Sequence, residues 1–210
     1  MFKKFFNPDN ALMITMTQVT DCIFLSLFWV LCSFPVLTVG AASAALYDAV
    51  YGGYRKGDKH PWGRFLGSFK RNLKASLLPE MVYLAIFCAA VWGLIQVWNA
   101  AVYGQISFGV FSAAAFVGML VLGILSVLFP MLSRFENSTA GLLRNTVLLA
   151  LANLPRTLAL GMLNGISILL TVRFIFPLFF LPALAALIST WLLEPMFKPY
   201  MPEEIPEDAA

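Results

Sequence analysis

The chain has 210 residues, of which 60% are hydrophobic and only 12% are charged, and its mean hydropathy is +0.81. Soluble domains typically carry about 45–50% apolar and roughly 25% charged residues. A chain of this length cannot bury so large an apolar surface in its own core. The composition therefore excludes an ordinary soluble enzyme and predicts an all-α, polytopic integral membrane protein.

Five apolar stretches are long enough to cross the hydrocarbon layer as helices, which takes about 20 residues for roughly 30 Å. They lie at about 17–37, 76–98, 107–133, 155–173 and 174–196. The last two are nearly continuous, so Arg173 is predicted to mark the turn between them. We expect residues 1–198 to form a single transmembrane domain and residues 199–210 to form an acidic cytoplasmic tail.

The segment 38–54 leaves a choice between five and six spans. It is rich in alanine and glycine, and it carries Asp48 near its centre, where an aspartate costs about 2.5–3.5 kcal/mol on insertion scales. Hydropathy therefore places it at the cytoplasmic surface or against other helices. A sixth span would instead leave only Arg173, of fourteen basic residues, outside the cytoplasm. The charge rule favours six spans, and we prefer five because the segment would face lipid poorly.

Basic residues gather in the polar stretch 55–75, which is typical of a cytoplasmic loop beside the bilayer rather than of nucleic-acid binding. Within it, residues 64–75 predict an amphipathic helix in the headgroup layer. Residues 137–153 predict a second one, with Ser138 or Thr139 as its cap. Both span counts keep the C-terminus in the cytoplasm.

The sequence contains no P-loop, no nucleophile elbow and no zinc-protease motif, and its only histidine, His60, has too few possible ligands near it for a metal site. We therefore expect no enzymatic activity, no cofactor and no metal. Small residues predict helix-packing positions instead, because they let backbones approach closely. These positions are Gly40, Ala44, Gly161 and Gly165.

Four segments carry a resemblance that covers nearly the whole chain. They are FFNPDN at 5–10, CSFPVLTVGAASAALYDAV at 32–50, FLGSFKRNLKAS at 65–76, and FPMLSRFENSTAGLLRNTVLLALANLPRTL at 129–158. In these segments the chain resembles the YesL-like family of small bacterial membrane proteins. The resemblance implies five or six spans, the bacterial cytoplasmic membrane, and genes found beside carbohydrate ABC importers. It implies no catalytic residue.

The expected function is that of a non-enzymatic accessory subunit, or assembly partner, that packs against the permease subunits of such an importer, with membrane lipid and the importer ATPase as further partners. The residues predicted to contact the partner are Asp48, Arg55, Lys56, Arg64, Lys70, Arg71, Glu136 and Arg144. A rival hypothesis is a stand-alone transporter or channel for a small solute, with Asp48 or Glu80 lining its pathway.

Overall fold

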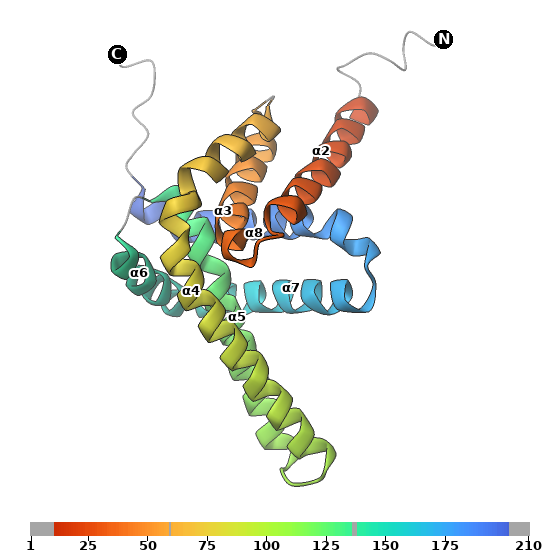
Figure 1. The fold of residues 1–210 in the computed structure, drawn as a ribbon, viewed down its shortest axis with the longest axis vertical. Coiled ribbons are helices and arrows are strands. Elements are labelled where there is room, and N and C mark those ends of the chain that lie inside the picture. Colours follow the sequence, from red (N-terminus) through yellow and green to blue (C-terminus); the bar gives the residue numbers. More distant parts are fainter. Residues whose placement is uncertain (1–10, 59, 136–137, 202–210) are drawn as a thin grey trace.

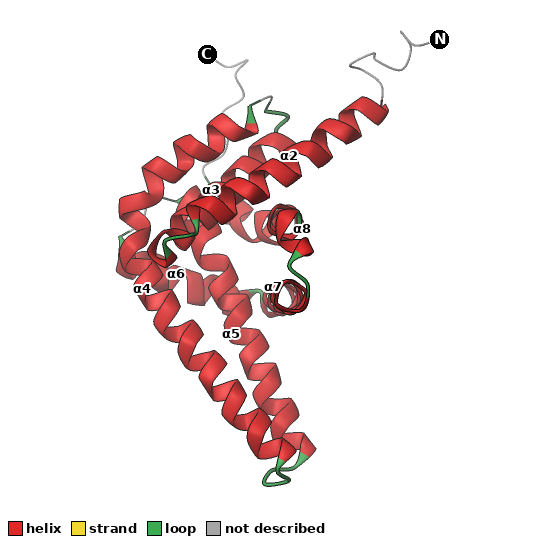
Figure 2. Ribbon diagram, turned by 45° about the vertical axis from the view of Figure 1, so that its right-hand side comes forward, coloured by secondary structure: helices red, strands yellow, loops and turns green. Residues whose placement is uncertain are grey.

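The computed structural model describes residues 11–58, 60–135 and 138–201, and every regular element in these ranges is helical (Figures 1 and 2). The α-helices are α2 (Ala11–Cys32), α3 (Val39–Val50), α4 (Pro61–Val102), α5 (Phe108–Arg134), α6 (Thr139–Ala152), α7 (Leu154–Arg173) and α8 (Leu181–Phe197). Shorter helical turns are η1 (Val36–Thr38), η2 (Tyr51–Arg55), η3 (Phe176–Phe179) and η4 (Lys198–Tyr200). The all-α prediction is confirmed for these residues.

Among the described residues, three helices are long and apolar enough to cross a membrane: α4, α5 and α7. The predicted spans 107–133 and 155–173 agree with α5 and α7 to within one residue at each end. The predicted span 174–196 is broken instead, because α7 ends at Arg173 and α8 begins only at Leu181. Pro177 and Pro182 each stand in the first turn of a new helical segment, where the missing N–H costs little.

The basic stretch 64–75 belongs to α4, so the prediction of a separate amphipathic helix there is wrong. Helix α4 runs without interruption for 42 residues, a length of about 63 Å at 1.5 Å per residue. It passes through Pro79, which is buried. Within the second predicted segment, 137–153, the helix α6 forms, and Ser138 caps it by accepting a hydrogen bond of 3.3 Å from the Gly141 N–H.

Helix α3 lies at the centre of the molecule, with ten of its twelve residues buried. It packs against α2, α4, α5 and α8. Residues 38–54 were expected to lie either at the cytoplasmic surface or against other helices, and the contacts of α3 agree with the latter. Alanine and glycine make this possible, because only small side chains let several helices approach one axis. Tyr47 of α3 joins a core cluster with α5 to α8, while Val50 joins another with α2, α4 and α8.

Helices α4 and α5 continue side by side beyond the rest of the molecule as a two-helix arm (Figures 1 and 2). The arm ends in a tight turn where Gly104 has a φ of 68°, a conformation that glycine adopts at no steric cost. Helix α7 crosses α5 steeply: it runs across α5 in Figure 1 and is seen nearly end-on in Figure 2. A membrane that the arm crosses upright would therefore hold α7 at a steep tilt.

Candidate functional site

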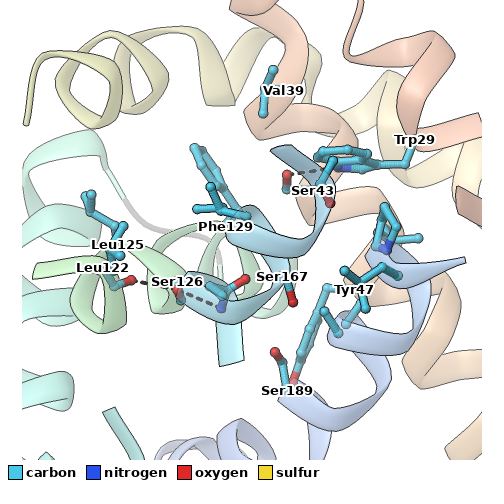
Figure 3. A pocket seen from close by; sticks show the side chains of 18 of the residues that line it. Trp29, Val39, Ser43, Tyr47, Leu122, Leu125, Ser126, Phe129, Ser167 and Ser189 are labelled. Atoms are coloured by element: carbon cyan, nitrogen blue, oxygen red, sulfur yellow. Dashed lines mark hydrogen bonds between the residues drawn. The ribbon is translucent and has the colours of Figure 1, made fainter. Parts of the chain in front are cut away.

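A partly open cavity of about 430 Å³ lies where α3, α4, α5, α7 and α8 converge (Figure 3). Pockets for small molecules typically measure 300–1,000 Å³ and are mostly apolar with a few polar groups. The apolar wall includes Leu84, Phe87, Leu122, Leu125 and Phe129. Of the residues that line the cavity, none carries a formal charge at neutral pH.

Polar groups enter this cavity from several helices. Asn164 of α7 donates through Nδ2 to Ser126 Oγ at 2.9 Å, which ties α7 to α5 (Figure 3). The Trp29 Nε1–H of α2 donates to Ser43 Oγ of α3 at 3.1 Å. Ser167 lies one turn beyond Asn164 and also lines the cavity. These groups give an apolar chamber a small number of fixed hydrogen-bonding positions.

A cluster of charged residues joins α3 to the basic half of α4. Asp48 pairs with Arg64 at 2.9 Å and with Arg71 at 3.6 Å, and Arg64 also pairs with Asp58 at 3.5 Å. The Asp48 side chain is only 8% exposed, so its charge depends on these partners. The backbone N–H of His60 donates to the Asp58 carboxyl at 3.0 Å and, together with Arg64, holds the pKa of that carboxyl below its ordinary value.

A second charged cluster joins α3, α5 and α8. Arg134 pairs with Glu194 at 2.8 Å, and the Tyr47 hydroxyl donates to the other Glu194 oxygen at 2.8 Å. The guanidinium of Arg134 also lies 3.9 Å from the centre of the Tyr51 ring. Both members of the ion pair are nearly buried, with 13% and 12% of their side chains exposed. This ion pair connects the C-terminal end of α5 to that of α8.

Glu80 is fully buried, and neither of its carboxyl oxygens has a hydrogen-bond partner among the described residues. The carboxyl lies against the first turn of α3, where a Cβ added to Gly40 would overlap both Glu80 Oε2 and the Phe129 ring. Backbone N–H groups at a helix N-terminus favour a nearby negative charge. The missing side chain of Gly40 leaves room for the Glu80 carboxyl. Glu80 itself is not among the residues that line the cavity.

The residues predicted to contact a partner divide into paired and exposed groups. Asp48, Arg64 and Arg71 come together in the cluster on α4, and Arg71 is the most exposed of the three. Arg55 lies over the Trp191 ring at 4.5 Å and Lys56 lies 5.8 Å from the centre of the Tyr51 ring. The exposed group also contains Lys70 on α4 and Arg144 on α6, and Glu136 lies outside the described residues.

The predicted packing residues differ in how closely they contact other helices. Gly161 of α7 lies against the α5 backbone, where an added Cβ would overlap the Met119 carbonyl oxygen. Gly165 has more room, since its nearest neighbour would be a Leu122 methyl at 3.9 Å. Gly123 of α5, which the sequence analysis did not select, faces the Thr157 carbonyl in the same way as Gly161 faces Met119. Gly40 and Ala44 are both buried in α3.

Sequence reasoning missed the cavity and its polar side. Asn164, Ser167 and Thr171 all line it, and their spacing of three and four residues along α7 puts them on one face of that helix. Polar residues at that spacing in an apolar helix were the one available signal. Within the described ranges no group of three or more His, Cys, Asp or Glu residues is placed to hold a metal ion.

These features define the class of protein as an all-helical chain with helices able to cross a membrane, an internal cavity and two ion-paired clusters. The model of a family described as "Protein of unknown function, DUF624" matches residues 22–94, from within α2 to the apolar half of α4. No curated protein matches the chain, and no solved structure does. The match covers the segment that holds α3 and the ion pairs of Asp48.

Proposed function

We propose that this chain is a non-enzymatic accessory membrane subunit, or assembly partner, of a bacterial carbohydrate ABC importer, and that it packs against the permease subunits. The type of importer and the bacterial cytoplasmic membrane come from the resemblance to the YesL-like family. The observation that carries the packing role is the uncovered arm of α4. Its most apolar stretch of eighteen residues has none of its residues buried within the chain.

Lipid can cover such a surface, but its composition also suits another helix. Ala85, Ala89 and Gly93 are exposed and lie four residues apart, so they share one face of α4. A Cβ added to Gly93 would meet no atom within 4 Å. Gln96 extends the same face with an exposed amide, and the exposed ring of Trp92 lies on this face beside Gly93. Small residues beside a polar side chain are typical of helix–helix contacts in membranes.

The topology that we propose has five spans, assigned to α2, α4, α5, α7 and α8, and a cytoplasmic C-terminus. Helix α4, at about 63 Å, is twice as long as the hydrocarbon layer is thick, so about half of it must stand outside. The half with the basic residues then faces the cytoplasm, as the charge rule favours. Importer partners, including the ATPase, would meet the exposed basic residues there, among them Lys70, Arg71 and Arg144.

The test is a mild-detergent pull-down from the native host through a C-terminal tag, with proteins counted by mass spectrometry. We expect two permease subunits and an ATPase at an abundance comparable to that of the tagged chain. Gly93→Leu should reduce the yield of permease several-fold, because it fills the small-residue face. Ile95→Phe is the matched control, since Ile95 is also exposed on the arm but off that face.

Recovery of the chain alone, or only as copies of itself, would overturn the proposal. That result would favour the rival function, a stand-alone transporter of a small solute, which the cavity between five helices supports. Solute flux in liposomes that contain only this protein would then be the deciding measurement.

A further inference from the structure

Two of the polar residues of α7 that line the cavity, Asn164 and Ser167, already use their hydrogen-bond donors within the protein. Asn164 Nδ2 donates both to Ser126 Oγ at 2.9 Å and to the Leu160 carbonyl at 3.0 Å. Ser167 donates to the Leu163 carbonyl at 2.7 Å. An amide oxygen and a hydroxyl oxygen each keep lone pairs after these bonds are made. What Asn164 and Ser167 offer a ligand is therefore acceptor oxygen.

Ser126 of α5 has the same character, whereas Ser43 of α3 serves as an acceptor for another helix. Ser126 donates to the Leu122 carbonyl at 2.6 Å. Ser43 Oγ accepts a hydrogen bond of 3.1 Å from the Trp29 Nε1–H, which holds the hydroxyl oxygen in place. A ligand that satisfies Asn164, Ser167 and Ser126 must bring hydrogen-bond donors of its own, and a hydroxyl group is the simplest uncharged donor.

The rest of the cavity selects against charge and for aliphatic surface. None of its lining residues is charged at neutral pH, so an ionised head group would lose its hydration without gaining a counter-charge. The rim includes Ile168 and Val172 of α7, which are 40% and 81% exposed. Because α7 is apolar enough to lie in a membrane, this rim opens the cavity toward hydrocarbon rather than toward an aqueous funnel.

We propose that the cavity binds an uncharged membrane amphiphile, with one aliphatic chain and a head group that carries free hydroxyls, of the monoacylglycerol type. The chain lies along the apolar wall of α4 and α5, and the hydroxyls donate to Asn164 Oδ1 and Ser167 Oγ on α7. This assignment rests on the cavity alone and holds whether or not the chain belongs to an importer.

The test is mass spectrometry of the intact protein released from detergent micelles after titration with three probes of equal chain length. Monoolein carries two free hydroxyls, methyl oleate carries none, and oleate carries a charge. We expect a one-to-one complex with monoolein, and binding of methyl oleate about tenfold weaker because the loss of one or two hydrogen bonds costs about that factor. Oleate should bind more weakly than monoolein for lack of a counter-charge.

Two substitutions and a control place the binding in the cavity. Asn164→Leu should remove the preference for monoolein over methyl oleate, and Ser167→Ala should reduce it several-fold with little risk to folding. Asn99→Leu, on the exposed arm of α4, is the matched control and should leave the preference unchanged. Equal binding of monoolein and methyl oleate, the absence of a one-to-one complex, or equal effects of Asn99→Leu and Ser167→Ala would overturn the proposal.

Discussion

Replacing Gly161 by alanine tests whether α5 and α7 are held by direct backbone contact. A Cβ at position 161 would overlap the Met119 carbonyl oxygen and would lie 3.1 Å from the Met119 carbonyl carbon and 3.2 Å from the Gly123 nitrogen. Attractive contacts between such atoms begin at about 3.5–4.0 Å. The overlapping atoms belong to a helix backbone, which cannot rotate away, so the two helices must separate.

Two opposing terms set the size of the effect. Forcing an extra group into a packed interface costs up to about 3 kcal/mol. Alanine, however, stabilises a helix interior by about 1 kcal/mol relative to glycine. We therefore expect Gly161→Ala to lower the free energy of unfolding by about 2 kcal/mol. Gly165→Ala keeps the helix-forming gain without the overlap, since its nearest neighbour would be at 3.9 Å, and should raise it by about 1 kcal/mol.

The assay is equilibrium unfolding of the purified protein in mixed micelles, with increasing fractions of a denaturing detergent. A third variant, Gly123→Ala, should behave like Gly161→Ala, because its added Cβ would overlap the Thr157 carbonyl oxygen at the same crossing. The double variant should lose less than the sum of the single losses, since helices already separated accommodate the second methyl group. If Gly161→Ala proved as stable as Gly165→Ala, the close crossing of α5 and α7 would be refuted.

Four further predictions concern charged side chains. Glu194→Gln should lower the free energy of unfolding by about 3–5 kcal/mol in the same assay, because it leaves the nearly buried Arg134 unpaired. Glu80→Gln should cost much less, because Glu80 has no ion-pair partner among the described residues. Asp48→Asn should cost about 1–2 kcal/mol, less than a fully buried pair because its arginine partners are partly exposed, and the loss should shrink in high salt. The pKa of Asp58 is lowered in the folded protein. Its stabilising effect is therefore complete above the ordinary aspartate pKa and is lost as the pH falls through the lower folded pKa. A carbon-detected NMR titration of Asp58 should give a midpoint below that of aspartate in an unfolded peptide.

Much of the helical layout was predictable because charged residues end the apolar runs. Arg134 and Arg173 are the last residues of α5 and α7, and both ends were placed to within one residue. The region after Arg173 was not predicted correctly, because hydropathy does not detect the extended backbone at Phe174 that ends α7. The stretch 64–75 predicts an amphipathic helix because its apolar and basic residues lie on opposite sides, but the same helix continues through the apolar residues that follow, since nothing in the sequence breaks the backbone there.

The cavity was beyond the reach of the sequence for a different reason. Its wall is built by residues as far apart as Trp29 and Ser189, so no local pattern contains it. The ion pairs were equally hidden, because the partners of Asp48 and Glu194 depend on how α3 packs. The sequence did predict that a helix of small residues carrying one acid would not face lipid. Asp48 pairs with Arg64 because α3 packs against the basic half of α4.

Helix α3 connects the charged end of the molecule to the cavity. Val39 and Ser43 of α3 line the cavity, and Asp48 forms the ion pairs with α4. Tyr47 takes part in both regions, because its side chain lines the cavity and its hydroxyl donates to Glu194. A ligand that shifts the Tyr47 ring must therefore also change the hydrogen bond that supports the pair between Arg134 and Glu194. By thermodynamic linkage such a relation would be reciprocal: a substitution that breaks the pair between Arg134 and Glu194 would change the affinity for the ligand by the factor by which the ligand changes the stability of that pair.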